Sequence, residues 1–387
     1  MYKIFARYSN SLIPLAFDSD MAEALKNLYS SAFYDKLGIA VSKVYPLFNV
    51  AEFRSEIYSD EFENMELKER MRHTTVVLHK FLPQNYTDDI EIVYKTINQL
   101  KINGIGEEGL AFMFLPDYIE FYGLDYFETS VPALEFVTQF VSCEFAVRPF
   151  LLKYGERMMA QMLKWSLHES HKVRRLASEG SRPRLPWAMG IPFLKENPEV
   201  VLPILENLKN DSSEWVRRSV ANNLNDIAKS HPNLVIETAK RWKNISAETD
   251  AIIKHGSRTL LKQGHLEILS YYGLDHREVG ISNVNIHNPK IKIGDSLEFS
   301  FSLANLKNAE QKIRLEYAIY YKKQNGQNTK KVYKISERIY PACAEIVITR
   351  KQKFIPITTR VFHSGEHHLA ITVNGAENEK YSFDLVI

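Results

Sequence analysis

The side chains best suited to chemistry are concentrated in a nine-residue segment in the middle of the chain. This segment runs from Glu179 to Trp187 with the sequence Glu-Gly-Ser-Arg-Pro-Arg-Leu-Pro-Trp, so a carboxylate, the guanidinium groups of Arg182 and Arg184, and an indole lie close together. Two prolines restrict the backbone and one glycine permits a tight bend, so a turn that exposes its side chains is predicted. The preceding residues 173–178 have a helical pattern, which places the segment at the C-terminal end of a helix.

Two further acidic residues stand at comparable places in the sequence. From Glu144 onward the sequence has a carboxylate, a spacer, an arginine (Arg148) and a proline. The same order of residue types begins at Glu179. Asp226 closes the segment 221–226, at the corresponding end of the following predicted helix. We therefore expect the two glutamates to occupy equivalent places in neighbouring repeats, and all three acids to converge on one site.

Converging carboxylates beside an indole suit the cleavage of an N-glycosidic bond. When a cationic base leaves as a neutral molecule, positive charge develops on the deoxyribose, and a fixed carboxylate can stabilise that charge and orient water. The positive charge of the base makes acid catalysis unnecessary. Trp187 would add stacking or cation–π attraction, and Arg182 and Arg184 would bind phosphates on either side. No lysine is obviously poised for Schiff-base chemistry, so we expect abasic-site formation without strand cleavage.

Each of these residues also has a structural alternative. A carboxylate near a helix end and next to an arginine is commonly a surface ion pair, and this alternative applies to all three acids. Trp187 could be a hydrophobic plug after Pro186. Trp165 and Trp215 occupy regular apolar positions, so we expect both in the core.

Other catalytic classes leave no signature in this sequence. It contains no phosphate-binding glycine loop, no HExxH helix, no Cys/His ligand cluster and no recognisable nucleophile elbow. Its two cysteines, Cys143 and Cys343, are too few and too far apart to indicate a disulfide framework or a zinc site. His168 and His171 are expected in a turn. We therefore expect neither a metal nor another cofactor.

The region from Met21 to about Tyr272 has a helical pattern throughout, and it contains an internal repeat. Helices are predicted over 65–82 and 198–209, and the sequence Val-Arg-Arg at 173–175 recurs at 216–218, a spacing of 43 residues. This period is typical of HEAT-like helical pairs, which stack into a curved solenoid because one amphipathic pair cannot bury its own face. The Val-Arg-Arg pairs could also be solvated helix faces. The candidate DNA-binding residues of this region are Arg148, Arg174, Arg175, Arg182, Arg184, Arg217, Arg218 and Asn222.

After Gly273 the spacing of the apolar residues changes from the helical period of about 3.6 residues to the strand period of about 2 residues. The segments 296–303, 313–320, 345–349 and 369–373 alternate between apolar and polar residues, with turn signals at 294–295, 325–326 and 374–375. About seven short strands in about 110 residues predict an immunoglobulin-like sandwich. The expected fold is thus mainly α, with a HEAT-like solenoid domain over 1–272 and a smaller all-β domain over 273–387.

Two predicted turns of the β-domain carry basic or histidine side chains. The hairpin 322–331 contains four lysines and several amides, which suit phosphates and minor-groove edges, and a second turn is predicted over 363–368. Lys330 and Lys331 are therefore candidate DNA-binding residues. The alternative is a solvated hairpin tip.

Charge is distributed unevenly along the chain, although the whole has a net charge of +2. Residues 1–144 carry 12 basic and 22 acidic side chains, whereas 145–270 carry 20 and 13 and 271–387 carry 17 and 12. A basic field over the last two thirds favours a polyanionic partner. No stretch approaches the ~20 apolar residues of a membrane span, and the start lacks the pattern of a signal peptide. We expect a cytoplasmic protein that associates with the bacterial nucleoid through DNA.

The run 179–187, the upstream Glu144, Trp215-Val-Arg-Arg and the segment 221–226 resemble AlkC-type DNA alkylation-repair glycosylases of the AlkC/AlkD family. The resemblance extends to the stretch 66–73 and to the β-domain. It implies an enzyme that acts on duplex DNA and excises 3-methyladenine and 3-methylcytosine without full base flipping. It also implies that Glu144 and Glu179 flank the sugar, that Asp226 lies nearest the anomeric carbon, and that Trp187 contacts the deoxyribose. Repair of a single lesion by a solenoid needs no dimer, so we expect a monomer without an obligate protein partner.

A non-catalytic HEAT-repeat scaffold that binds DNA or protein is the alternative function. Such a scaffold does not need Glu179 or Trp187, so their substitution would leave it unchanged. An RNA-binding module is disfavoured because no RNA-recognition motif is present.

Overall fold

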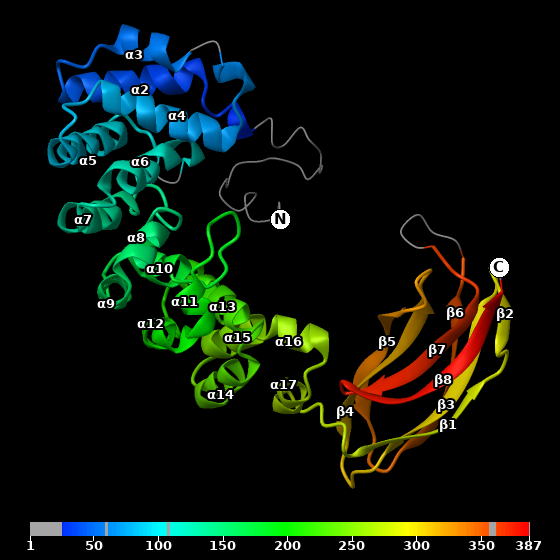
Figure 1. The fold of residues 1–387 in the computed structure, drawn as a ribbon. Helices are drawn as coiled ribbons and strands as arrows, with labels where there is room; N and C mark the ends of the chain where they lie inside the picture. The colour runs from blue at the N-terminus through cyan, green and yellow to red at the C-terminus, as the bar shows by residue number, and fades with distance from the viewer. Residues whose placement is uncertain (1–24, 59–60, 107–108, 356–360, 387) are drawn as a thin grey trace. The chain divides into compact units, whose positions relative to one another are not determined.

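The computed structural model describes residues 25–58, 61–106, 109–355 and 361–386. The chain divides into two compact units (Figure 1). Unit 1 extends to Val235 and includes Trp242–Gly256, and unit 2 consists of Ile236–Arg241 and Ser257–Ile387. None of the helices in the described ranges has the length and apolar character that a membrane span requires.

The described elements are helices from Ser31 to Tyr271 and strands from Val279 onward. The helices are α2 (Ser31–Val44), α3 (Val50–Ile57), η2 (Phe62–Asn64), α4 (Leu67–Lys80), α5 (Tyr86–Ile102), η3 (Leu110–Met113), α6 (Phe114–Gly123), α7 (Phe127–Val137), α8 (Val147–Tyr154), α9 (Glu156–Trp165), α10 (His171–Gly180), α11 (Pro192–Glu196), η4 (Pro198–Val201), α12 (Leu202–Leu208), α13 (Glu214–Ala228), α14 (Pro232–Trp242), α15 (Ala247–Gly256), α16 (Arg258–Gln263) and α17 (Leu266–Tyr271). The predicted helices over 65–82 and 198–209 correspond to α4 and to η4 with α12.

Local sequence signals mark the starts of several helices. The side chain of Asn49 accepts a hydrogen bond from the backbone N–H of Glu52 (3.2 Å) and caps α3. Glu66 and Glu69 form a reciprocal capping box at the start of α4. These contacts satisfy N–H groups that have no partner within the helix.

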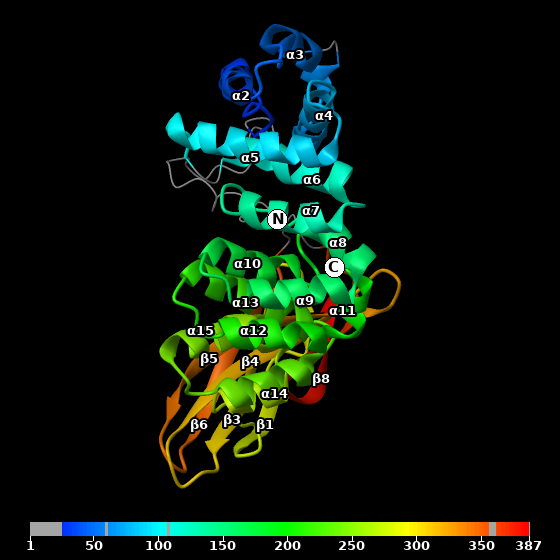
Figure 2. The same ribbon diagram turned by 90° about the vertical axis from the view of Figure 1, so that its left-hand side faces the viewer.

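The helices of unit 1 pack mainly against helices that are near in sequence, as in a repeat protein (Figures 1 and 2). Examples are the pairs α4 with α6, α10 with α13, and α13 with α15. The 43-residue repeat places its two copies on the neighbouring helices α10 and α13. The prediction of a helical-repeat fold is therefore confirmed.

The first arginine of each Val-Arg-Arg copy closes the turn before its own helix. The Nη1 of Arg174 donates to the carbonyls of His168 and Glu169, six and five residues earlier. The Nη1 of Arg217 donates in the same way to the carbonyls of Asp211 and Ser212. The repeated motif thus has a structural role in the turn between the two helices of a pair.

Eight described strands form two sheets in unit 2. The strands are β1 (Val279–Ile286), β2 (Lys290–Lys292), β3 (Ser296–Asn305), β4 (Gln311–Lys322), β5 (Asn328–Tyr340), β6 (Glu345–Lys353), β7 (Gly365–Val373) and β8 (Ala376–Val386). The sheet orders are β1-β3-β6 and β2-β8-β7-β4-β5. Side chains of both sheets, including Phe299, Leu303, Ile319 and Leu369, form one apolar core. This is the sandwich that the period of two predicts.

Turn chemistry fixes the register of the hairpin between β7 and β8. Asn374 and Gly375 both have positive φ, +45° and +83°, and Val373 pairs with Ala376 across the two-residue loop. An Asn-Gly pair of this kind matches the twist of the strands. The predicted turn at 363–368 is wrong in part, because Gly365 already begins β7 and His367 is fully buried within it.

The change from helix to strand falls between Tyr271 and Val279, beside the expected boundary at 272. The compact units divide earlier, because α16 and α17 group with the sheets. In unit 2, Gly375 packs so closely against Gly264 and Leu269 that a Cβ atom there would lie 2.4 Å from the carbonyl of Gly264.

Candidate active site

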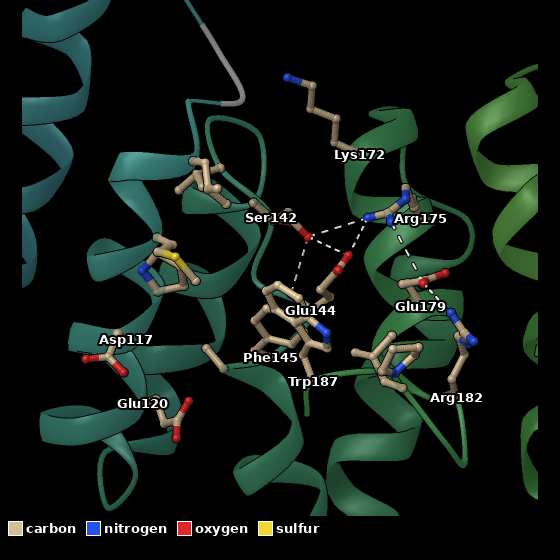
Figure 3. A pocket seen from close by; sticks show the side chains of 18 of the residues that line it. Asp117, Glu120, Ser142, Glu144, Phe145, Lys172, Arg175, Glu179, Arg182 and Trp187 are labelled. Carbon is tan, nitrogen blue, oxygen red and sulfur yellow. Dashed lines mark hydrogen bonds and ion pairs between the residues drawn. The ribbon is translucent and has the colours of Figure 1, made fainter. Parts of the chain in front are cut away.

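A largely apolar cavity of about 120 Å³ lies within unit 1 (Figure 3). Its walls come from α4, η3, α6, the segment 138–146, α10, the loop 182–187 and the first turn of α13. Met71, Met113, Phe145, Leu185 and Trp215 contribute apolar surface. The acidic side chains among its lining residues are Asp117, Glu120, Glu144 and Glu179.

The three acids singled out from the sequence form one continuous network with two arginines. Nη1 of Arg175 contacts Oε2 of Glu144 at 2.6 Å, and its Nη2 lies 3.9 Å from Oε1 of Glu179. Arg182 donates to Oε1 of Glu179 at 2.6 Å and to Oδ2 of Asp226 at 2.7 and 2.8 Å. Arginine side chains thus link all three acids, and each acid has a basic partner.

Burial and ion pairing act in opposite directions on this network. Burial by itself would raise the pKa of Glu179, but the charges of Arg182 and Arg175 outweigh it and hold the pKa below its ordinary value. Burial would likewise lower the pKa of Arg182, whereas Glu179 and Asp226 raise it. Glu179 is therefore an ionised carboxylate at neutral pH although only 5% of its surface is exposed.

Asp226 occupies a different place from the two glutamates. It is 2% exposed, it does not line the cavity, and Lys229 binds its second oxygen, Oδ1, at 2.8 Å. Glu144 and Glu179 do line the cavity, but Glu144 precedes α8 whereas Glu179 is in the last turn of α10. Their expected equivalence in successive repeats is therefore wrong; Arg175 brings them together instead.

Arg148 organises the loop that carries the predicted site. Its guanidinium is fully buried and donates to the carbonyls of Met189 (2.7 Å), Gly180 (2.9 Å) and Arg182 (2.8 Å). Burial lowers its pKa to about 10. The expected phosphate contact of Arg148 is therefore wrong, because the group has no exposed surface.

Trp187 lines the cavity in an unusual backbone conformation. Its φ is +70°, a region that residues with a Cβ rarely adopt, and Lys68 of α4 donates to its carbonyl at 2.8 Å. The indole is half-buried and lies at the cavity with Phe145 and Glu144 (Figure 3). A strained residue held by long-range contacts is typical of a functional site.

Several predicted phosphate ligands are engaged within the protein. Arg174 makes a bidentate contact with Asp211 at 2.6 and 2.9 Å, in addition to its carbonyl contacts. Arg182 is buried between two acids, and Arg184 donates to the carbonyl of Asp226 at 2.8 Å. The expected phosphate contacts of Arg174 and Arg182 do not agree with these geometries.

Other candidates lie on accessible surface. Arg218 has 50% of its side chain exposed, beside a groove between α13 and α15, and Asn222 contacts His255 of α15 at 3.2 Å. Arg217 also lines this groove. In unit 2, Lys330 and Lys331 are exposed residues of β5, and Lys330 contacts Glu377 at 2.6 Å.

Comparison with known proteins identifies the family. A family model described as the C-terminal Ig-like domain of the uncharacterised protein YhaZ matches residues 280–387. The uncharacterized protein YhaZ of Bacillus subtilis (strain 168) is 43% identical over 362 residues, 93% of this chain and 99% of the relative. The alkylpurine DNA glycosylase AlkC of Pseudomonas fluorescens was solved bound to DNA containing an abasic site analog, and its sequence is 34% identical to this chain. The match covers 94% of this chain and 99% of the AlkC chain, with a TM-score of 0.79. The chain belongs to the AlkC and YhaZ family.

Membership of the AlkC family confirms the resemblance that the run 179–187 indicated. It also confirms the order of the fold, a helical-repeat region followed by an Ig-like domain.

Two features of the cavity in this AlkC-family protein were not predicted from the sequence. Trp215 was expected in the core with Trp165, but it is half-buried, lines the cavity and lies 5.5 Å from the guanidinium of Arg175; Trp165 is buried as expected. The acids of α6, Asp117 and Glu120, lie across the cavity from Glu179 (Figure 3). Two acids within an otherwise apolar helix are the signal that could have revealed them.

Proposed function

We propose that this protein is a monofunctional DNA glycosylase that hydrolyses the N-glycosidic bond of cationic alkylated bases, such as 3-methyladenine and 3-methylcytosine, in duplex DNA without full base flipping. The observation that carries the proposal is the network from Glu144 to Asp226 at the wall of an apolar cavity. The relative AlkC supports it, since AlkC is an alkylpurine DNA glycosylase that was solved with DNA. The product of base excision is an abasic site.

In this proposal Glu144 and Glu179 stabilise the sugar as the bond breaks. The C1′–N bond breaks heterolytically, and its electron pair leaves with the base, which departs neutral. Positive charge then lies on the deoxyribose, beside two carboxylates that Arg175 and Arg182 hold in place. Water adds to the sugar carbon and releases a proton. A carboxylate that is ionised and already oriented stabilises this charge without reorganisation.

Asp226 acts in this scheme as a positioning residue and not as a direct contact to the sugar. It binds Arg182, and Arg182 in turn binds Glu179. Trp187 contributes a half-buried indole that would contact the deoxyribose or its developing charge.

The DNA backbone would bind to exposed basic residues, first among them Arg218, Lys330 and Lys331. Arg218 belongs to the helical domain, proposed over 1–272, and the two lysines belong to the β-domain over 273–387. Nonspecific affinity of this kind comes from counterion release at phosphates. One lesion needs one active site, and we propose a monomer without an obligate protein partner.

The test is release of free base from methylated duplex DNA by the wild-type chain, E144Q, E179Q and D226N, at matched DNA affinity. E156Q is the control, because Glu156 is an exposed residue at the start of α9. We expect wild type and the control to release 3-methyladenine or 3-methylcytosine. E144Q and E179Q should be slower by about 100-fold or more, by analogy with loss of one group that stabilises transition-state charge.

D226N should retain more activity than E179Q, because its effect passes through Arg182. Tight DNA binding without base release by the wild-type chain would contradict the proposal and favour a non-catalytic scaffold. Release that persists in both E144Q and E179Q would remove the catalytic role from this network.

A further inference from the structure

Lys68 of α4 is an exposed lysine whose ammonium group contacts two aromatic residues of the cavity wall. Its Nζ donates a hydrogen bond of 2.8 Å to the carbonyl of Trp187, 119 residues later in the chain. The same Nζ lies 5.8 Å from the centroid of the Phe145 ring, within the range of a cation–π interaction. Trp187 and Phe145 line the cavity beside Glu144 (Figure 3). One ammonium group therefore joins the loop of Trp187 to the segment that carries Phe145.

The start of α4, which carries Lys68, is held in place by several contacts. Glu66 and Glu69 form the reciprocal capping box described above. Arg70 is 3% exposed, and its guanidinium donates to three backbone carbonyls that precede the helix, at 3.0, 3.3 and 3.4 Å. Because Lys68 projects from a fixed helix end, its hydrogen bond can restrain the loop of Trp187.

A lysine at this place does not stabilise the helix itself. Lys68 is the second residue of α4, where the unpaired backbone N–H groups give the helix end a partial positive charge. A cation in the first turn is unfavourable there, whereas the neighbouring Glu69 is favourable. Replacement of Lys68 by a neutral side chain should therefore leave α4 at least as stable. Its contacts outside the helix, with Trp187 and Phe145, are the physical reason for a positive charge at this position.

Trp187 is in a conformation that needs an external restraint. Its φ of +70° is unfavourable for a residue with a Cβ atom, so the backbone keeps it only where surrounding contacts hold it. Arg148 holds the loop on either side of Trp187, through the carbonyls of Arg182 and Met189. The hydrogen bond from Lys68 acts between these two points, on the strained residue itself.

We propose that Lys68 is a positioning residue, which holds Trp187 in this conformation and so keeps the indole beside Phe145 and Glu144. The inference rests on the proposed function, in which Trp187 contacts the deoxyribose. Lys68 touches neither the sugar nor the base in this scheme. Without Lys68 the loop is free to leave its strained conformation, so the site binds DNA as before but reaches its reactive arrangement less often.

Fluorine NMR of the chain labelled with fluorotryptophan tests the position of Trp187 without depending on catalysis. The chain has four tryptophans, and the variant W187F assigns the signal of Trp187. Spectra are compared for wild type, K68M, K68R and the control K95M, whose residue is exposed on α5. The signals of Trp165 and Trp242, each 1% exposed, report whether the fold is retained.

We expect the signal of Trp187 to shift or broaden in K68M and to stay at its wild-type position in K95M, while the two buried tryptophans are unchanged in both. K68R should restore the signal at least in part, because a guanidinium can donate to the same carbonyl. An unchanged Trp187 signal in K68M would overturn the proposal. A change of all four signals, together with a lower Tm, would give Lys68 a purely structural role and would also overturn it.

Single-turnover base release separates positioning from DNA binding. Release of 3-methyladenine from methylated duplex DNA is followed at rising protein concentration, which gives the rate constant at saturation and the half-saturating concentration. Misplacement of a group by about 1 Å can cost about 100-fold in rate, so K68M should be slower at saturation by about tenfold or more, with the half-saturating concentration unchanged. K68R should recover part of the rate, and K95M should equal wild type. A K68M variant that is slower only because it binds DNA more weakly would make Lys68 a phosphate ligand and overturn the proposal.

The proposed function fails separately. If the wild-type chain releases no base from methylated DNA, the glycosylase assignment is lost, but the Trp187 signal still decides whether Lys68 positions the indole. If base is released and K68M is as fast as wild type at saturation, only the further inference fails.

Discussion

Replacement of Arg182 by methionine should destabilise unit 1 strongly, and more at pH 8 than at pH 5. The Arg182 side chain is 7% exposed and contacts two acids that are themselves almost completely buried, Glu179 at 2.6 Å and Asp226 at 2.7 Å. Methionine keeps much of the apolar stem but leaves both carboxylates without the guanidinium. Removal of one partner of a buried ion pair typically costs about 3–5 kcal/mol.

The pH dependence follows from the pKa of Glu179. In the wild-type chain Arg182 and Arg175 hold this pKa below its ordinary value against the effect of burial, so the pairing stabilises the fold above the unfolded pKa and is lost as pH falls through the folded one. In R182M burial prevails, the pKa of Glu179 rises, and the carboxyl becomes neutral by protonation at mildly acidic pH. The penalty of an unpaired buried charge is then smaller.

Thermal and urea unfolding at about pH 8 and about pH 5 would measure the difference. A loss of about 3–5 kcal/mol corresponds to a fall in Tm of roughly 10 °C for a domain of this size. The control is R218M, because Arg218 is half-exposed and pairs with Glu214 on the surface of α13, where a loss below about 1 kcal/mol is expected. A loss in R182M as small as in the control, or equal at both pH values, would refute the reasoning.

Three further predictions follow from individual residues. The substitution E120Q should make the protein more stable than wild type by about 1–2 kcal/mol at pH 8, as measured by urea unfolding. The pKa of Glu120 is raised to about 7 in the folded protein, so the wild-type chain loses stability as the pH rises from the pKa of the unfolded state to about 7. Equal stability of E120Q and wild type at pH 8 would contradict this explanation. R218A should reduce the slope of log K for duplex DNA against log salt by about 0.9, whereas R174A, whose guanidinium is held by Asp211, should leave the slope unchanged. The substitution G375A should destabilise unit 2 by about 2 kcal/mol or more, as measured by thermal unfolding. The φ of Gly375 is +83°, and the new Cβ atom would lie 2.3 Å from the side chain of Leu269. An unchanged Tm would contradict this packing.

The helices, the strands and the change between them could be predicted because they depend on local signals. Period, capping residues and turn dipeptides act over a few positions, and the Asn-Gly pair at 374–375 by itself specifies a two-residue hairpin. The 43-residue repeat predicted that α10 and α13 are neighbours. The nine-residue run and its family resemblance also pointed to the loop of Trp187, which lines the cavity.

The roles of individual charged residues could not be predicted in the same way. Arg174 and Arg175 are adjacent and chemically identical, yet the helix directs one to the turn at Asp211 and the other to the cavity. Burial of Arg148 likewise depends on the carbonyls that a loop more than thirty residues later presents to it.

The sequence alone therefore determined the elements, their repeat and the segment that lines the candidate site, because short-range backbone preferences and hydrophobic periods depend on neighbouring residues. Only the tertiary structure decided which charges are neutralised. It paired Arg182 with Asp226 of another helix and brought Trp215 from an expected core position to the cavity wall. Electrostatic roles depend on distance and burial, and both are set by the packing of successive repeats.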